Sequence, residues 1–147
     1  LYYKQKNMSL FEALHMLYEK YGYHLETIRS FVFQGKEGLE SMRKLIDSFR
    51  KEGITISDEF KIEQVEDYLK GTVTHLNDGT VIQLNYPKSN VLKYIFTDGS
   101  WICVRPSGTE PKLKLYFGVK GVSEEDVKRK LELLITPLIE KVKQFQN

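Results

Sequence analysis

A hairpin signal in the second half of the chain sets the strongest limit on its fold. Two apolar segments, 92–96 and 101–105, flank a turn that contains Asp98 and Gly99. An Asp-Gly turn between such segments predicts two antiparallel strands, because both residues tolerate the backbone conformation that a tight hairpin needs. Since side chains alternate along a strand, one face of the second strand should carry Trp101, Cys103 and Arg105.

A third strand is predicted shortly after this hairpin. Between residues 112 and 120, apolar residues alternate with lysines and one tyrosine. Alternation with a period of two is typical of a strand that has one buried and one solvated face. The solvated face would carry Lys112, Lys114, Tyr116 and Lys120. The short segment before residue 112 must therefore join two antiparallel strands.

The first third of the chain predicts a helix followed by an extended segment. Ser9 begins a capping-box pattern, and an apolar stripe at helical spacing continues from there to Gly22. Residues 27–33 are β-branched and aromatic, which favours a strand. Residues 60–65 also have the composition of a strand, but the pattern between 54 and 87 is mixed.

Two further helices are expected, one before and one after the hairpin. Apolar residues recur at helical spacing over 39–49, and the stripe ends before Gly53. Ser123 is followed three residues later by Asp126, which is typical of a helix N-terminus. The helix that begins there should run nearly to the end of the chain. Pro137 should kink it or split it in two, because proline removes one internal hydrogen bond.

These segments together predict an α+β fold, with a four-stranded, mainly antiparallel sheet packed against helices. A chain of 147 residues can form one core, or one domain that carries a piece of another. Because the chain begins with Leu1 and shows no capping signal there, we expect it to be a piece of a longer protein.

Composition excludes several broad classes of protein. The formal net charge is only +2, which is too small for a protein that binds nucleic acid through many phosphate contacts. No apolar run approaches the length of a membrane span, and the first residues lack a signal-peptide core. A cytoplasmic protein with no membrane partner is therefore expected. The single Cys103 cannot form an internal disulfide and is expected to be a small buried residue on a strand.

Residues 105–111 read Arg-Pro-Ser-Gly-Thr-Glu-Pro and carry the groups that hold a phosphate. Arginine presents planar donors that match phosphate oxygens, and serine and threonine add hydroxyl donors. A glycine allows backbone N–H groups to converge on an anion. Turns of this composition also occur as ordinary hairpin connections. The composition alone leaves both alternatives open.

This string also resembles the phosphate-binding loop in the C-terminal domain, domain 4, of the phosphohexomutases, the family of phosphoglucomutase and phosphomannomutase. Weaker similarity to bacterial phosphoglucomutases extends over residues 21–25, 35–50 and 112–121. The resemblance implies a fold similar to the TATA-box-binding protein. It also implies that residues 36–147 form the substrate-phosphate-binding domain, and that residues 1–35 are the tail of the preceding domain, a helix plus an extended segment.

The resemblance further implies which residues contact the substrate. The phosphate of a hexose phosphate would be held by Arg105, Ser107, Gly108 and Thr109. The full-length enzyme would be an intramolecular phosphotransferase that interconverts glucose 1-phosphate and glucose 6-phosphate, and this loop would anchor the phosphate that is not reacting. A phosphomannomutase or a phosphopentomutase is the alternative within the family.

The other motifs of the family are not found in this sequence. It contains no Thr-Ala-Ser-His-Asn-Pro string, no Asp-Gly-Asp-Ala-Asp metal loop and no Gly-Glu-x-Ser-Gly sugar loop. We therefore assign no catalytic residue and no metal ligand in this chain. Mg²⁺ is expected for the full-length enzyme, bound outside this chain, and the chain alone should be inactive.

An interaction module is the alternative from another class. The basic residues of the predicted strand face, with Tyr116 among them, could bind single-stranded nucleic acid or another protein. The small net charge favours a solvated strand face instead. The histidines lie far apart in sequence without a matching carboxylate pattern, so surface or packing roles are expected for His15, His24 and His75.

Overall fold

The computed structural model describes residues 22–85 and 87–146. Its strands are β1 (Tyr23–Val32), β2 (Ile62–Asp67), β3 (Thr72–His75), β4 (Val81–Gln83), β5 (Leu92–Phe96), β6 (Trp101–Pro106) and β7 (Lys112–Gly121). Its helices are α3 (Gly35–Glu52) and α4 (Glu124–Gln146). The helix expected to begin at Ser9 lies outside the described residues.

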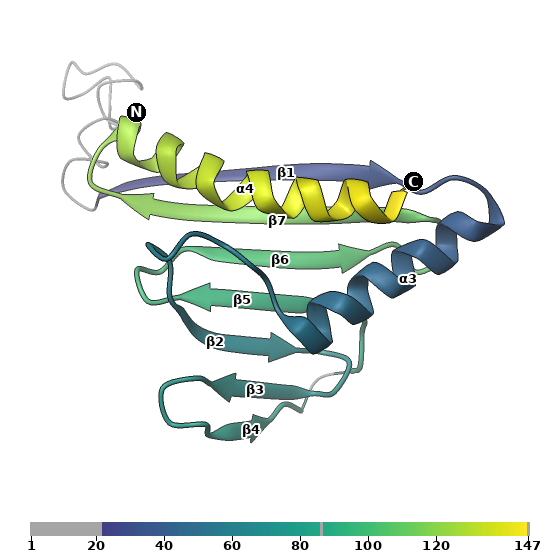
Figure 1. The fold of residues 1–147 in the computed structure, drawn as a ribbon. Helices are drawn as coiled ribbons and strands as arrows, with labels where there is room; N and C mark the ends of the chain where they lie inside the picture. Colours follow the sequence, from purple (N-terminus) through teal and green to yellow (C-terminus); the bar gives the residue numbers. More distant parts are fainter. Residues whose placement is uncertain (1–21, 86, 147) are drawn as a thin grey trace, which may run out of the picture.

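The described strands form one sheet in the order β1-β7-β6-β5-β2-β3-β4. Every neighbouring pair is antiparallel. Figure 1 shows α3 and α4 over the same face of this sheet, with α4 running along β1 and β7. The predicted α+β class is therefore confirmed, and the opposite face of the sheet carries no helix in the described part of the chain.

The expected number of strands was wrong, because the sheet has seven strands rather than four. β1 forms an edge of the sheet through a continuous ladder with β7 that runs from Tyr23 opposite Gly121 to Val32 opposite Lys112. β3 and β4 have only four and three residues, which is too short for a period to be recognised in the sequence. The domain boundary expected near residue 35 stays a prediction.

The predicted hairpin and the strand after it are confirmed. β5 and β6 pair with Leu92 opposite Val104, and β6 pairs with β7 with Arg105 opposite Lys114. Gly99 has a φ of 89°, a value in the left-handed region that favours glycine in such a turn. Along β7 the apolar residues are buried and the lysines exposed, as the alternation predicts.

The predicted stripe of α3 is also confirmed. The helix buries Met42, Leu45, Ile46 and Phe49. It ends at Gly53, whose N–H donates to the carbonyl of Phe49 and whose φ of 76° is left-handed. The buried side chains of α3 and α4 form one core with the inward residues of β5, β6 and β7.

The last helix begins as predicted but is not split. The Ser123 hydroxyl accepts a hydrogen bond from the backbone N–H of Asp126 at 3.0 Å, which caps the helix. Pro137 lies inside one continuous helix, α4. Residues before and after the proline are buried in the same core, among them Leu134 and Leu138, so packing outweighs the lost hydrogen bond. No helix in the described residues is long and apolar enough to cross a membrane.

Candidate functional site

The candidate phosphate loop connects the end of β6 to the start of β7. The backbone N–H of Ser107 donates to the carbonyl of Lys112 at 2.8 Å, which closes the base of the loop. The carbonyl of Pro111 accepts a hydrogen bond from the N–H of Phe33 at 2.7 Å. Phe33 is fully buried just after β1, so the loop is fixed to the sheet at its base and to the core at its far end.

Inside the loop, the Ser107 hydroxyl shapes the backbone. Its Oγ accepts from the N–H of Glu110 at 3.2 Å and from that of Thr109 at 3.4 Å. Serine often stabilises turns through such contacts. Since these contacts use only its oxygen, the Ser107 hydroxyl still has a proton to donate. Within the described residues the N–H of Gly108 makes no hydrogen bond, so the loop retains an open backbone donor at its tip.

The bend of the loop does not depend on Gly108 being glycine, whereas the phosphate contact expected of its N–H stays a prediction. The φ of Gly108 is not in the left-handed region that glycine favours. A Cβ placed on Gly108 would meet no atom within 4 Å. The bend therefore does not require glycine at this position, because the hydrogen bonds to Ser107 already define it.

Arg105 supplies the positive charge of the site. Its side chain is exposed, and no carboxylate within the described residues lies in ion-pair distance of it, whereas Glu110 pairs with Lys112 at 3.2 Å. Arg105 lines three cavities, of about 500, 470 and 440 Å³. The loop residues Ser107 and Gly108 line two of these. An uncompensated guanidinium beside open donors is suited to bind an anion.

A second arginine lies near the loop and was not recognised from the sequence. Arg43, on the exposed side of α3, lines the cavity of about 440 Å³ together with Arg105, Ser107 and Gly108. It also has no ion pair with the described carboxylates. Its position next to Met42 in the helical stripe indicates only that it lies beside the core. The sequence holds no signal that α3 passes close to the loop.

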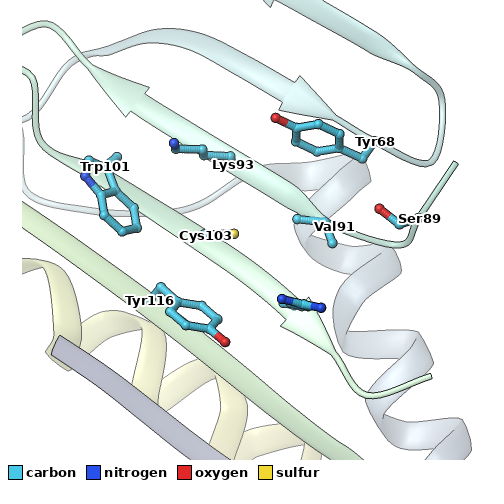
Figure 2. Close-up of a pocket in the computed structure, with 8 residues that line it drawn as sticks. Tyr68, Ser89, Val91, Lys93, Trp101, Cys103 and Tyr116 are labelled. Carbon is cyan, nitrogen blue, oxygen red and sulfur yellow. The ribbon is translucent and has the colours of Figure 1, made fainter. Parts of the chain in front are cut away.

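The cavity of about 500 Å³ lies on the face of the sheet opposite the helices. Figure 2 shows Trp101 and Cys103 on one strand, with Lys93 and Tyr116 on either side of them. Trp101, Cys103 and Arg105 share this face, as predicted, and Tyr116 is opposite Cys103 in the ladder. The aromatic and basic residues of three adjacent strands therefore come together on one surface.

Cys103 is half-buried rather than buried. Burial raises the pKa of its thiol, and the charges of Lys93 and Arg105 offset only part of that effect. The thiol therefore stays protonated near neutral pH, which disfavours a nucleophilic role.

The histidines do not form a site in the described residues. His24 Nε2 lies 3.7 Å from a carboxylate oxygen of Glu26 on exposed β1, and His75 is on β3. His15 is outside the described residues. Among residues 22–85 and 87–146, no three His, Cys, Asp or Glu side chains gather as a metal site.

The fold and this site define an α+β domain with a cationic loop at one end of its antiparallel sheet. The family model described as "Phosphoglucomutase/phosphomannomutase, C-terminal domain" matches residues 54–133 of the chain, which is more than half of it. The chain therefore belongs to the phosphoglucomutase/phosphomannomutase family and represents its C-terminal domain.

Curated relatives agree with this assignment. The phosphoglucomutase of Staphylococcus aureus strain USA300 is 37% identical over 127 residues, which are 86% of this chain and 23% of the relative. The protein of strain N315 is 36% identical with the same coverage. The chain thus spans about a quarter of the length of these relatives.

A solved structure supports the fold. The chain aligns with the open form of the exocytosis-sensitive phosphoprotein pp63/parafusin, a phosphoglucomutase from Paramecium, with a TM-score of 0.58 and 17% sequence identity. The alignment covers 97% of this chain and 25% of the other. At this identity the likeness supports the fold alone.

Proposed function

We propose that this domain anchors the non-reacting phosphate of a sugar phosphate in a phosphoglucomutase. The observation that carries the proposal is the position of Arg105, whose guanidinium has no partner carboxylate in the described chain and lies where three cavities meet. The open donors of Ser107 and Gly108 line two of the same cavities. The S. aureus relatives are named phosphoglucomutase, which supports a sugar phosphate as the class of ligand.

Each residue has a distinct part in this anchor. Arg105 binds two phosphate oxygens through its guanidinium fork. Ser107 donates its hydroxyl proton, and Gly108 donates its backbone N–H. Thr109, which is exposed at the tip of the loop, donates its hydroxyl. The loop binds and orients the substrate and takes no part in bond making.

An anchor of this kind suits a reaction in which the sugar presents either end to one reactive serine. The remote phosphate then provides binding energy that positions the reacting end. We propose that the full-length protein interconverts glucose 1-phosphate and glucose 6-phosphate in the cytoplasm, with its serine and its Mg²⁺ site in preceding domains.

The described residues offer no cluster of side chains that fits Mg²⁺, so the residues of this chain have no part in metal binding in this proposal. The chain alone is inactive in this proposal.

Binding by the isolated chain tests the anchor directly. Inorganic phosphate or glucose 6-phosphate should shift the backbone amide resonances of residues 107–109, with a dissociation constant of about 1 mM or weaker, because one loop supplies only part of the site. Arg105→Ala should abolish the shifts. Arg29→Ala is the matched control, since Arg29 is an exposed arginine on β1 whose side chain, in the described part of the chain, hydrogen-bonds only to its neighbours Thr27 and Ile28. Absence of any shift in the wild-type loop would contradict the anchor.

In the full-length enzyme, Arg105→Ala should lower kcat/KM by about 10- to 100-fold, as expected for a lost charge-assisted contact. Phosphorylation of the serine should remain possible. Coupled assays with glucose, mannose and pentose phosphates would separate phosphoglucomutase from phosphomannomutase and phosphopentomutase.

A nucleic-acid or protein interaction module is the second candidate. It is favoured by the exposed Lys112 and Lys114, which share the open sheet face with Tyr116 and Trp101. An electrophoretic shift with short oligonucleotides tests it. Tight, salt-dependent binding that survives Arg105→Ala would favour this candidate over the phosphate anchor.

A further inference from the structure

We propose that the phosphate held by the loop also contacts a second wall of donors, formed by Arg43 of α3 and the side chain of Asn90. Both residues line the cavity of about 440 Å³, together with Arg105, Ser107 and Gly108. We call it the helix-side cavity. The ligand is the phosphate group of the proposed sugar phosphate, so this inference rests on the proposed function. It adds two binding residues that lie outside the loop.

The charged side chains that line the helix-side cavity are all cationic. Among the described residues they are Arg43 and Arg105, and no carboxylate lines this cavity. By contrast, Glu110 and its ion-pair partner Lys112 both line the cavity of about 470 Å³. A phosphate ester carries close to two negative charges at neutral pH. Two guanidinium groups without a carboxylate beside them therefore match its charge.

Arg43 is not paired within its own helix. Residues three and four positions apart on a helix are neighbours, so Glu40 and Asp47 are both placed to pair with Arg43. Glu40 instead lies 3.7 Å from Nζ of Lys44. No carboxylate in the described chain lies in ion-pair distance of the Arg43 guanidinium. Its planar donors therefore remain available to phosphate oxygens in the cavity.

Asn90 supplies an oriented neutral donor. Its Oδ1 accepts a hydrogen bond from a guanidinium nitrogen of Arg50 at 2.9 Å. Because arginine can only donate, the oxygen of the Asn90 amide must face Arg50, and the NH₂ group must face away from it. The buried ion pair of Arg50 with Asp67, at 3.0 Å, holds this arrangement in place. The NH₂ group makes no hydrogen bond within the described residues, so it is free to donate to a ligand.

Three separate segments form the helix-side cavity: α3, residues 89–91 before β5, and the loop after β6. Figure 1 shows α3 passing beside the end of β6, where the loop begins. The side chains of Met42 and Ile46 give the cavity an apolar floor, and they are only 2% and 1% exposed. Such a floor lowers the local dielectric, which strengthens the attraction between an anion and its donors.

The side-chain amide of Asn90 gives a direct readout of this contact. When inorganic phosphate is added to the isolated chain, the two side-chain N–H resonances of Asn90 should shift together with the backbone amides of residues 107–109. The side-chain amide of Asn77 is an internal control. Asn77 lies between β3 and β4, which β2 and β5 separate from β6 in the sheet, so its resonances should not move.

Arg43→Met tests the charge of α3 and keeps an unbranched side chain. This variant should weaken the binding of inorganic phosphate about fivefold, as expected for one lost charge-assisted contact at an exposed site. Arg43→Lys should weaken it only about twofold, because lysine keeps the charge but not the planar fork. Arg29→Met is the matched control on β1 and should leave the affinity unchanged. Since Arg43 is exposed, its variants should unfold at the urea concentration of the wild type.

Two results would overturn the second wall. One is an unchanged affinity for inorganic phosphate in Arg43→Met. The other is a set of Asn90 side-chain resonances that stays in place while the amides of residues 107–109 shift. Either result leaves the phosphate anchor of the loop standing, because Arg105→Ala tests that anchor separately. If the loop amides of the wild type do not respond to phosphate, the proposed function itself fails, and the second wall fails with it.

Discussion

The indole of Trp101 lies against the backbone of Gly118, its neighbour across the β6–β7 ladder. A Cβ on Gly118 would overlap the Nε1 and Cε2 atoms of the indole. We therefore expect Gly118→Ala to lower the free energy of unfolding by about 1–3 kcal/mol, the usual cost of overpacking. Urea unfolding monitored by circular dichroism would measure the loss.

The same contact predicts coupling between the two positions. In Trp101→Ala the space above Gly118 is open, so adding Gly118→Ala should cost less than it does in the wild type. The four proteins of this double-mutant cycle give the interaction free energy. If the losses of unfolding free energy in the two single variants simply add, the clash with the indole is not what destabilises Gly118→Ala.

Gly108→Ser should be tolerated, in contrast to Gly118→Ala. Gly108 does not have a left-handed φ, and a Cβ there meets open space. The free energy of unfolding should therefore change by less than about 0.5 kcal/mol. Thermal unfolding of the two variants side by side checks the contrast. A loss for Gly108→Ser as large as that for Gly118→Ala would contradict the described loop.

Arg50→Met should be strongly destabilising. The Arg50 Nε donates to the Asp67 carboxylate at 3.0 Å, and these side chains are only 9% and 8% exposed. Arg50 also donates to the Asn90 side chain at 2.9 Å. Removal of the guanidinium would leave a buried carboxylate without its ion pair, at a cost of about 3–5 kcal/mol.

Arg50→Met should also change the backbone environment near the candidate site. Asn90 precedes Val91, which lines the cavity of about 500 Å³ on the open face of the sheet, so the amide resonances of residues 89–91 should move in Arg50→Met. Lys128→Met removes an exposed ion pair with Glu124 and should cost less than about 1 kcal/mol. Chemical denaturation measures the free energy of unfolding of both variants. Equal losses in Arg50→Met and Lys128→Met would contradict the prediction that the buried ion pair contributes more than the exposed one.

Asp126 should contribute to acid sensitivity. A hydrogen bond from the Val122 N–H, together with Arg129, holds the pKa of this carboxyl below its usual value. A lowered pKa in the folded state stabilises the protein above the unfolded pKa of about 4, and this stability is lost as the pH falls through the folded pKa. The stability difference between the wild type and Asp126→Ala should therefore be largest above about pH 5 and shrink toward pH 2.

Thermal unfolding across this pH range measures the effect. Asp98 has a lowered pKa as well: burial would raise it, but hydrogen bonds from Ser100 and Lys130 outweigh that effect. The comparison must therefore use the difference between the two proteins, in which the contribution of Asp98 cancels. A difference that does not change with pH would contradict the role of the Asp126 charge.

Local patterns predicted the strands that surround the loop. The Asp98-Gly99 turn and the alternation along β7 depend on side-chain period and turn chemistry, which neighbouring residues determine. The N-terminus of α4 followed in the same way from Ser123 and Asp126, whose hydrogen bond is local. The continuity of α4 through Pro137 did not follow, because burial against the sheet decides whether the helix tolerates the proline.

The sequence by itself determined that an arginine stands at a strand end, followed by a short turn with hydroxyl groups and an antiparallel return strand. Only the tertiary structure decided what surrounds that arginine. Arg43 comes from α3, Lys93 from β5 and Tyr116 from β7, and each lies near Arg105 through sheet order and helix packing. Such contacts join residues far apart in the chain, and their register depends on the packing of the whole core rather than on any local pattern.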